Sequence, residues 1–349
     1  MIKKIGVLHG REDNFPNALY EIVARKSGGK IVAERMMIGA ERLRKKWDYD
    51  LILDRISHDY PYYRYVLKSA AAEGAYVIPN PFQWSADDKF LGFNLADRLG
   101  IPTPRTVVLP ISGSTNLYDI NDQSLRNLKW LGQESWEEIF AYIGFPGWLK
   151  PASGGGWLAV SKVGSREEFW HAYNHAVFHE RPLGLADEAA DLAIRRWMSR
   201  SLIFLFQQDI PFDKFARCWY LGGEVIVARF IPPDRVAGQR LGRYEAAPEF
   251  FGKDLLDKLV AHVRAINEGL GYEINTVEFL VKDGVPYVID FLNFACDLDV
   301  ASVGQYFADL CIDKVADYLI ACVDDPSVRL QHQSELWTKL ITGRPPQPG

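Results

Sequence analysis

The sequence predicts an α/β protein whose C-terminal half changes to an antiparallel α+β arrangement. Near the N-terminus, short apolar runs alternate with amphipathic segments and no hairpin turn separates them, which is typical of a parallel sheet. From residue 202 onward, apolar runs follow one another across tight glycine turns, as antiparallel strands do. We therefore expect an N-terminal parallel domain (1–83), a central region (84–205) with a glycine-rich subdomain (144–200), a C-terminal subdomain (206–325) and a tail (326–349).

The composition is that of an ordinary globular chain. Its 349 residues are 48% hydrophobic and 24% charged, with a net charge of −5, which argues against a general nucleic-acid binder. No apolar run approaches the roughly 18 residues of a membrane helix, and Met1-Ile2-Lys3-Lys4 leads directly into a strand instead of a signal-peptide core. The four cysteines show neither CxxC nor metal-ligand spacing, which favours reduced, buried thiols. We expect a cytoplasmic protein that binds neither nucleic acid nor membranes.

The N-terminal domain offers a possible substrate-binding edge. Ligands of open parallel sheets bind beyond the carboxyl ends of the strands, and two of these ends carry polar segments, at 9–12 and 55–60. Arg55 and His58 are therefore candidate substrate-binding residues, with simple surface packing as the alternative. The expected strands lie at 5–8, 31–33, 51–53 and 76–78, and the expected helices at 17–25 and 63–73.

The central region is expected to begin with a capped helix. Ser85-Ala86-Asp87-Asp88 has the pattern of a capping box, and Gly100 ends the helix. Lys89 stands in the first turn, where the helix dipole disfavours a cation, so it either binds a ligand or is simply solvated. Residues 111–133 are polar and turn-rich and indicate an insertion, followed by a helix at 135–142. The apolar stripe of the capped helix is expected to consist of Phe90, Leu91, Leu95 and Leu99.

A glycine-rich flap follows between two short strands. The first strand ends at Lys150 and Pro151, and Ser153, Gly154, Gly155 and Gly156 come next. Glycine allows positive φ and close approach, so the backbone N–H groups of such a loop can bind a polyanion, with Lys150 as a point charge for phosphate. An ordinary hairpin with an exposed lysine is the alternative. A strand at 158–163, a helix at 166–174 and a second insertion at 179–200 complete this region.

The C-terminal half alternates strands, loops and helices. We expect strands at 202–206, 215–220 and 224–230, a loop at 232–244, a helix at 248–270, a hairpin of 274–281 with 285–291, and a helix at 303–322. The loop carries Arg235, Arg240 and Arg243, which either hold an anionic substrate group or are solvated. Asp297 and Asp299 either orient a cationic amine or serve the N-terminus of the last helix.

Two acids in apolar strands indicate a metal site. Glu278 and Asp290 are costly there unless they are paired or bound to a cation, and with Asn293 they form a set of hard oxygen ligands that suits Mg²⁺. A three-residue loop, Lys282-Asp283-Gly284, would bring both acids to one face of the hairpin. Arg217 and Arg229 interrupt apolar strands in the same way, and a purely structural salt-bridge network with these acids is the alternative.

Taken in order, these residues resemble a known pattern. The series runs from Asp88-Lys89 through the flap and Phe206-Gln207-Gln208-Asp209 to Arg217, Arg229, Glu278 and Ile289-Asp290-Phe291-Leu292-Asn293. It is similar to that of the ATP-grasp superfamily, most closely to ligases of the RimK type, which modify ribosomal protein S6, and of the glutathione synthetase type. The likeness covers about residues 76–320, and the preceding α/β layer looks like the N-terminal domain of that family.

The resemblance implies a role for each position. Lys89 and Lys150 would hold nucleotide phosphates beneath a flap of Ser153, Gly154, Gly155 and Gly156. Gln207 and Gln208 would lie at the adenine, with Asp213 or Lys214 at the ribose, and Arg217 and Arg229 would face the γ-phosphate and the acyl-phosphate. Glu278, Asp290 and Asn293 would bind two Mg²⁺ ions, although Asp290-x-x-Asn293 is one residue longer than the usual Glu-x-Asn.

The implied activity is that of an ATP- and Mg²⁺-dependent ligase that joins a carboxylate to an amine or another nucleophile through an acyl-phosphate, releasing ADP and phosphate. Its substrates would be small-molecule or peptide carboxylates and amines, and the resemblance suggests a homodimer through the N-terminal domain. A small-molecule kinase of the same fold and a nucleotide-binding module without turnover are the alternatives.

Overall fold

The computed structural model describes most of the chain and divides it into two compact units. The first unit combines residues 1–84, 213–286 and 290–349, and the second combines 85–212 with the short stretch 287–289. None of the helices in the described residues is long and apolar enough to cross a membrane. The described residues are 2–10, 12, 14–58, 60–82, 89–109, 126–129, 131–152, 160–178, 203–233, 242–293 and 295–330.

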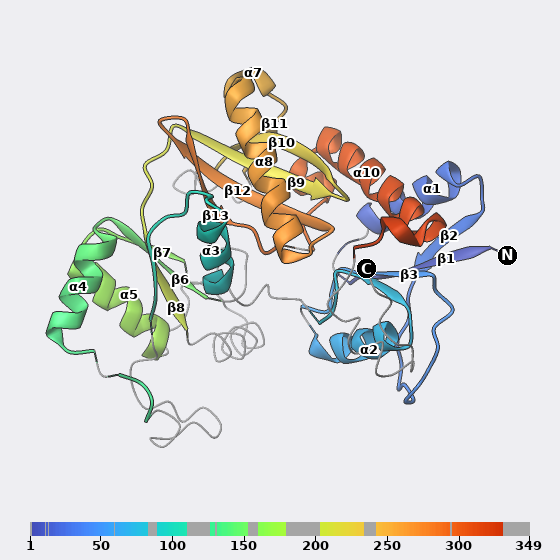
Figure 1. Ribbon diagram of the computed structural model, residues 1–349, viewed down its shortest axis with the longest axis horizontal. Helices are drawn as coiled ribbons and strands as arrows, with labels where there is room; N and C mark the ends of the chain where they lie inside the picture. The colour runs from blue at the N-terminus through green and yellow to red at the C-terminus, as the bar shows by residue number, and fades with distance from the viewer. Residues whose placement is uncertain are drawn as a thin grey trace. The chain divides into compact units, whose positions relative to one another are not determined.

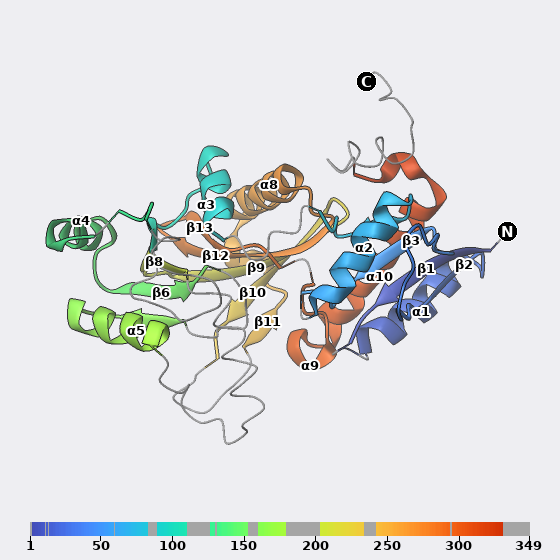
Figure 2. The same ribbon diagram turned by 90° about the horizontal axis from the view of Figure 1, so that it is seen from below.

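The N-terminal part of the first unit is a parallel sheet with the strand order β2-β1-β3-β4, as predicted from the alternating pattern. Side chains of a strand alternate between faces, so Leu51 and Leu53 face α1 and α10 whereas Ile52 faces α2. Figure 2 shows these three helices next to the strands of this sheet. The elements are β1 (Lys3–Leu8), α1 (Asn14–Lys26), β2 (Ile31–Arg35), β3 (Leu51–Asp54), α2 (Pro61–Ala72), β4 (Tyr76–Ile78) and α10 (Gln305–Asp324).

The rest of the first unit is built on an antiparallel sheet with the order β11-β10-β9-β12-β13 (Figure 1). Trp219 on β9 stacks on Phe307 of α10 with the ring centroids 5.2 Å apart. Trp219 shares one core cluster with Val7 of β1, so α10 joins the two sheets of this unit into a single core. The strands are β9 (Lys214–Leu221), β10 (Glu224–Ile231), β11 (Arg243–Glu245), β12 (Ile274–Lys282) and β13 (Val285–Asp290).

Two glycines with positive φ divide helices where the sequence indicated no boundary, inside the predicted helix 248–270 and one residue after the predicted start at 303. Gly252 (φ 75°) separates α7 (Pro248–Phe251) from α8 (Lys253–Leu270), and Gly304 (φ 80°) separates α9 (Val300–Val303) from α10. An α-helix cannot continue through positive φ, and glycine takes it without a Cβ penalty. The predicted loop 232–244 was also wrong at its end, because Tyr244 lies in β11 and packs on Trp219. A 3₁₀ turn (Pro326–Val328) follows α10.

The second unit is an antiparallel sheet with the order β5-β8-β6-β7. Strands β6 and β7 pair directly, as the predicted flap hairpin requires. Aromatic side chains such as Phe206 of β8, Phe169 of α5 and Phe140 of α4 fill its core. The elements are α3 (Lys89–Arg98), β5 (Thr106–Leu109), α4 (Gln133–Ile143), β6 (Gly147–Pro151), β7 (Ser161–Val163), α5 (Arg166–Phe178) and β8 (Phe204–Gln208).

Helix α3 buries a different face from the one predicted. Its buried residues are Gly92, Phe93 and Ala96, whereas Leu91 and Leu99 are about half exposed. Apolar side chains surround the first turns of this helix, so spacing alone did not single out one stripe, and the small residues allow the closer approach. The predicted capping box at 85–88 lies outside the described residues.

The cysteines meet the expectation for reduced thiols. All four are buried and none forms a disulfide. Burial raises the pKa of Cys296 to about 11, so this thiol stays protonated near neutral pH.

Candidate functional site

In the second unit, the structure brings the two lysines of the predicted phosphate site to the same end of the sheet. The half-buried Lys150 of β6 donates from Nζ to the carbonyl oxygen of Ile289 at 3.2 Å, and this ammonium lies 4.8 Å from the ring centroid of Phe93 on α3. The backbone N–H of Lys89 donates to the carbonyl oxygen of Ala152 at 3.2 Å. Helix α3 therefore begins beside the end of β6, next to the start of the predicted flap.

The flap itself, Ser153, Gly154, Gly155 and Gly156, lies outside the described residues, as do Arg235 and Arg240. The strands that carry the flap are described, and their register pairs Leu149 with Ser161 and Trp148 with Lys162. Binding of phosphate by the flap therefore stays a prediction.

The two glutamines of β8 use their side chains to hold the neighbouring strand β5. Gln207 is buried, and its Nε2 donates to Oγ1 of Thr106 at 2.8 Å. The side-chain oxygen of Gln208 accepts from the backbone N–H of Arg105 at 3.4 Å, and the backbone N–H of Gln208 donates to the carbonyl of Arg105 at 2.9 Å. These contacts give the end of β8 a fixed position and leave the predicted adenine contact untested.

In the first unit, the predicted ribose contacts differ in their surroundings. The ammonium of Lys214 donates to the carbonyl oxygen of Phe250 and lies 4.7 Å from the ring of that residue. Asp213 is exposed, and its backbone N–H donates to the carbonyl of Val281 at 3.0 Å. Of the two, Asp213 is the better candidate to accept hydrogen bonds from ribose hydroxyls.

Arg217 and Glu278 form the central ion pair of the first unit. They lie opposite each other on β9 and β12, Nη1 of Arg217 is 2.9 Å from Oε1 of Glu278, and each side chain is 15% exposed. Burial lowers the pKa of Arg217, but the nearby Glu278 and, more weakly, Tyr244, Cys296 and Asp290 outweigh it, so the pKa is raised overall. Glu278 is therefore the main partner of this guanidinium, and Asp290 adds a smaller contribution.

The oxygen donors of this region fit Mg²⁺ completed by a nucleotide. Magnesium is commonly held by one or two carboxylates together with waters and substrate phosphates, and Glu278, Asp290 and Asn293 supply two carboxylates and an amide oxygen. In the described part of the chain, no group of three or more His, Cys, Asp or Glu side chains could hold a metal ion by itself.

The turn between β12 and β13 corrects one prediction. Strand β12 ends at Lys282 and β13 begins at Val285, and Asp283 (φ 51°) and Gly284 (φ 74°) form a two-residue turn. Two positive φ angles are typical of the type I′ turn, whose twist matches that of the strands, and aspartate tolerates this region better than most residues. The predicted three-residue loop was therefore wrong. With regular pairing, a two-residue turn sets Glu278 opposite Ile289, so the predicted reason for placing Asp290 on the same face of the hairpin as Glu278 is lost. Asp290 still raises the pKa of Arg217, but less than Glu278 does.

The register separates Arg229 from Arg217. Arg229 of β10 lies opposite Ala216, and Ala228 lies opposite Arg217, so the two arginines project from opposite faces of the sheet. Arg229 donates from Nη1 to Oε2 of Glu245 at 3.0 Å and lies 4.3 Å from the ring of Phe250. The exposed Arg243 of β11 shares the face of Arg229. The structure thus does not bring Arg229 to the Arg217–Glu278 pair.

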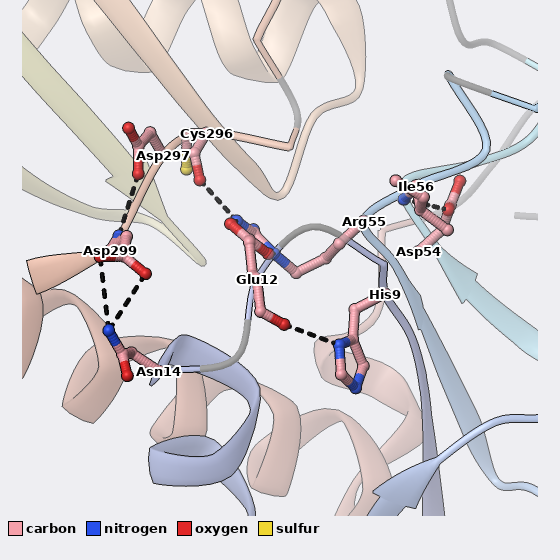
Figure 3. Close-up of polar contacts among 9 residues, drawn as sticks. All are labelled: His9, Glu12, Asn14, Asp54, Arg55, Ile56, Cys296, Asp297 and Asp299. Atoms are coloured by element: carbon pink, nitrogen blue, oxygen red, sulfur yellow. Dashed lines mark hydrogen bonds and ion pairs between the residues drawn. The ribbon is translucent and has the colours of Figure 1, made fainter. Parts of the chain in front are cut away.

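The predicted substrate edge forms a polar cluster in the first unit (Figure 3). Arg55 is buried, and its guanidinium donates to both carboxylate oxygens of Glu12 and, at 2.6 Å, to the carbonyl of Cys296. Burial lowers the pKa of Arg55, but the pair with Glu12 outweighs it and the pKa is raised. Arg55 therefore bridges segments of this unit, whereas His58 is exposed.

The same cluster contains the acids predicted to orient an amine. Oδ1 of the half-buried Asp297 accepts from the backbone N–H of Asp299 at 3.0 Å. Asp299 accepts from Nδ2 of Asn14 at 3.3 Å and from the backbone N–H of Ala301 at 2.9 Å, so it caps α9. For Asp299, the structure thus favours the predicted alternative, in which this acid caps the N-terminus of a helix, over a contact with a substrate amine.

Comparison with known proteins identifies the fold. No family model and no curated protein matches the sequence. The RimK-domain ATP-grasp protein of Sphaerobacter thermophilus DSM 20745 matches with a TM-score of 0.56 and 18% identity over 90% of this chain and 98% of that one. The D-alanine–D-alanine ligase of Bacillus anthracis complexed with ATP matches with a TM-score of 0.55 and 16% identity over 92% and 96% of the respective chains. The ATP-grasp ligase PsnB complexed with a minimal precursor, Mg and ADP matches with a TM-score of 0.52 and 15% identity over 92% and 98%. The chain has the ATP-grasp fold.

Within this ATP-grasp fold, one contact group at the end of β8 escaped the sequence reasoning. Asp209 accepts from Nε1 of Trp148 at 2.6 Å and from Nζ of Lys162 at 2.9 Å. Trp148 lies between Lys162 and Gln207 in the register of three adjacent strands, so one carboxylate ties β6, β7 and β8 together. Asp209 stands in the series that carries the resemblance, but the sequence assigned it no role.

Proposed function

We propose that this chain is an ATP- and Mg²⁺-dependent ligase that joins a carboxylate to an amine or another nucleophile. The observation that carries the proposal is the half-buried Arg217–Glu278 ion pair in a chain of the ATP-grasp fold. Solved ligases of that fold, one complexed with ATP and another with Mg and ADP, support it.

Lys150 and Lys89 are proposed to bind the nucleotide phosphates. The carbonyl of Ile289 and the face of Phe93 orient the ammonium of Lys150, so it needs little reorganisation when an anion arrives. Ser153, Gly154, Gly155 and Gly156 would close over the phosphates and exclude water. Gln207 and Gln208 would set the strand end that meets the adenine, and Asp213 would accept from the ribose.

Glu278, Asp290 and Asn293 are proposed to hold two Mg²⁺ ions. Bound Mg²⁺ neutralises charge on phosphate oxygens during transfer. Arg217 balances the two carboxylates when no ion is present and spreads charge on the transferred phosphoryl group. Arg229 is assigned no direct role, because it projects from the opposite face of the sheet.

The proposed chemistry has two steps. An oxygen of the substrate carboxylate attacks the γ-phosphorus, the bond to the β,γ-bridging oxygen breaks, and ADP leaves. The amine then attacks the acyl carbon of the resulting acyl-phosphate, the bond between that carbon and the phosphate oxygen breaks, and the amine loses a proton as inorganic phosphate leaves. The chain's cations stabilise the charge in the first step, and no side-chain nucleophile is required.

The substrates are proposed to be a small-molecule or peptide carboxylate and an amine in the cytoplasm. The half-buried carboxylate of Asp297 suits a cationic amine, and the exposed Arg243 suits an anionic group. His58 is exposed at the same N-terminal sheet edge as Arg55 and is a further candidate for substrate contact.

The test is ADP release from ATP and Mg²⁺ in the presence of pooled carboxylates and amines. Release that needs both pools, and that is lost in Glu278→Gln, supports the ligase. ADP formed together with a phosphorylated alcohol would instead identify a kinase. Bound ATP without release across both pools would contradict turnover altogether.

A further inference from the structure

The segment that follows β13 is held by one buried side chain. Strand β13 ends at Asp290, and beyond it the carbonyl oxygen of Phe291 accepts from Nδ2 of Asn275 at 2.6 Å. The backbone N–H of Asn293 donates to Oδ1 of Asn275 at 2.8 Å. The amide of Asn275 thus satisfies one backbone acceptor and one backbone donor on the path from Asp290 to Asn293.

Asn275 is itself fixed from the other side. Its Nδ2 also donates to Oδ1 of Asn267 on α8 at 2.8 Å, and Nδ2 of Asn267 donates to the carbonyl of Val263 at 2.7 Å. Both asparagine side chains are completely buried. Both Nδ2 hydrogens of Asn275 are therefore used, and a flipped amide would set oxygen against the carbonyl of Phe291. Such a fully satisfied buried network specifies one geometry.

The register shows that Asn275 lies on the opposite face of β12 from the proposed Mg²⁺ ligand Glu278. Asn275 and Glu278 are three residues apart on β12, so they project from opposite faces of the sheet. Asn275 lies on the face covered by α8, and Glu278 lies on the face of Arg217. Any effect of Asn275 on the proposed metal site must therefore pass through the backbone of residues 291–293.

We infer that Asn275 is a positioning residue for the proposed Mg²⁺ site, which it serves by fixing the backbone between Asp290 and Asn293. The inference rests on the proposed function, because it takes Asp290 and Asn293 as oxygen donors. Without the Asn275 amide, the two backbone groups lose their buried partners and the side chain of Asn293 is no longer directed. Groups that orient metal ligands typically change metal affinity about 10–100-fold when they are removed.

The experiment measures metal affinity in the full chain, apart from turnover. Mn²⁺ is titrated in the presence of ADP, and free Mn²⁺ is followed by electron paramagnetic resonance. The variants are Asn275→Ala and Asn275→Asp, which keeps the acceptor for Asn293 but presents oxygen to Phe291. Asn80→Ala is the matched control, because Asn80 is a buried asparagine that accepts from the backbone N–H of Phe82 at 3.0 Å in the N-terminal part.

We expect both Asn275 variants to bind Mn²⁺ at least about tenfold more weakly, and Asn80→Ala to stay within twofold of the wild type. If the wild-type chain binds Mn²⁺ and the Asn275 variants bind it with the same affinity, this inference is overturned but the proposed function is not. A wild-type chain that does not bind Mn²⁺ with ADP would overturn the proposed function, and this inference with it. If neither variant folds, hydrogen exchange of the wild-type chain decides, because rapid exchange of the Asn293 amide contradicts the hydrogen bond to Asn275.

Discussion

Replacing Arg217 by methionine tests how far this guanidinium stabilises the carboxylates of Glu278 and Asp290. The substitution keeps an unbranched chain in place of the aliphatic part of arginine but removes the guanidinium, which pairs with Glu278 and whose pKa Asp290 also raises. Glu278→Gln is the matched perturbation, because Arg217 keeps its charge and the glutamine oxygen can still accept from Nη1. The two variants remove opposite ends of one pair and leave different groups uncompensated.

The magnitudes follow from the geometry of the pair. An N–O distance of 2.9 Å at 15% exposure describes a largely buried ion pair, and removing one partner of such a pair typically costs about 3–5 kcal/mol. We expect Arg217→Met to lower the free energy of unfolding by about this amount at pH 7. Glu278→Gln exchanges an ion pair for a hydrogen bond from the charged guanidinium to a neutral amide oxygen and should cost only about 1–2 kcal/mol.

The loss in Arg217→Met should depend on pH and on Mg²⁺. Two carboxylates without a counter-charge repel each other, which raises the pKa of one of them above its value in the unfolded chain. A group with a raised folded-state pKa contributes stability at low pH that is lost as the pH rises through that pKa, so the defect should be smaller at pH 5 than at pH 8. Mg²⁺ at about 100 times its dissociation constant should restore about 2.7 kcal/mol.

Urea unfolding followed by tryptophan fluorescence, with and without Mg²⁺ and at pH 5, 7 and 8, measures these effects. Equal losses in the two variants, or an Arg217→Met defect that neither Mg²⁺ nor acid reduces, would refute the reasoning that Glu278 and Asp290 share one cation position.

Three further predictions follow from individual residues. Lys150→Met should lower the rate of ATP-dependent ADP release by about 10²–10³, measured with a coupled ADP assay, whereas Lys253→Met, whose side chain is 84% exposed on α8, should not; equal rates in the two variants would exclude a phosphate role for Lys150. Burial, with Lys258 nearby, lowers the pKa of His262, so the folded chain binds fewer protons than the unfolded chain below pH 6.5. The free energy of unfolding should therefore decrease as the pH is lowered below that value. His262→Leu should make the urea midpoint decrease less between pH 7 and pH 5, and an unchanged decrease would contradict the lowered pKa of His262. Gly222→Ala should destabilise the chain by at least about 2 kcal/mol more than Gly223→Ala, because a Cβ at Gly222 would lie 2.2 Å from the Tyr318 ring whereas a Cβ at Gly223 meets nothing within 4 Å; thermal unfolding measures both, and equal losses would count against this packing.

The sequence was a good guide wherever the determining signal is local. Alternating apolar runs located the parallel strands, and β4 coincides with the prediction at Tyr76–Ile78. Turn residues such as Gly222 and Gly223 marked the hairpin between β9 and β10, because their positive φ angles require glycine. The order of charged residues was enough to suggest the ATP-grasp fold, since that series reflects the positions of strand ends and centres.

The parts that failed depend on pairing partners far away in the chain. Nothing near Arg229 in the sequence shows that Glu245 is its partner, because β11 lay hidden in a segment read as a loop. The face of α3 was misread because the choice among several apolar residues is made by packing against other elements. The turn at Asp283 was misread although Asp-Gly is typical of a two-residue type I′ turn, because the three-residue loop was preferred as the one that would bring Glu278 and Asp290 to one face.

Strand β12 shows why these long-range choices matter for function. Its one face carries Glu278, which pairs with Arg217, and its other face carries Asn275, which binds the backbone on either side of Leu292. A one-residue slip of β12 would exchange these faces, placing the carboxylate against α8 and the amide against Arg217. The buried asparagine pair opposes such a slip, because its hydrogen bonds to α8 are satisfied in only one register. The same contacts that position the segment after β13 therefore also keep the carboxylate of Glu278 on the face where Arg217 lies.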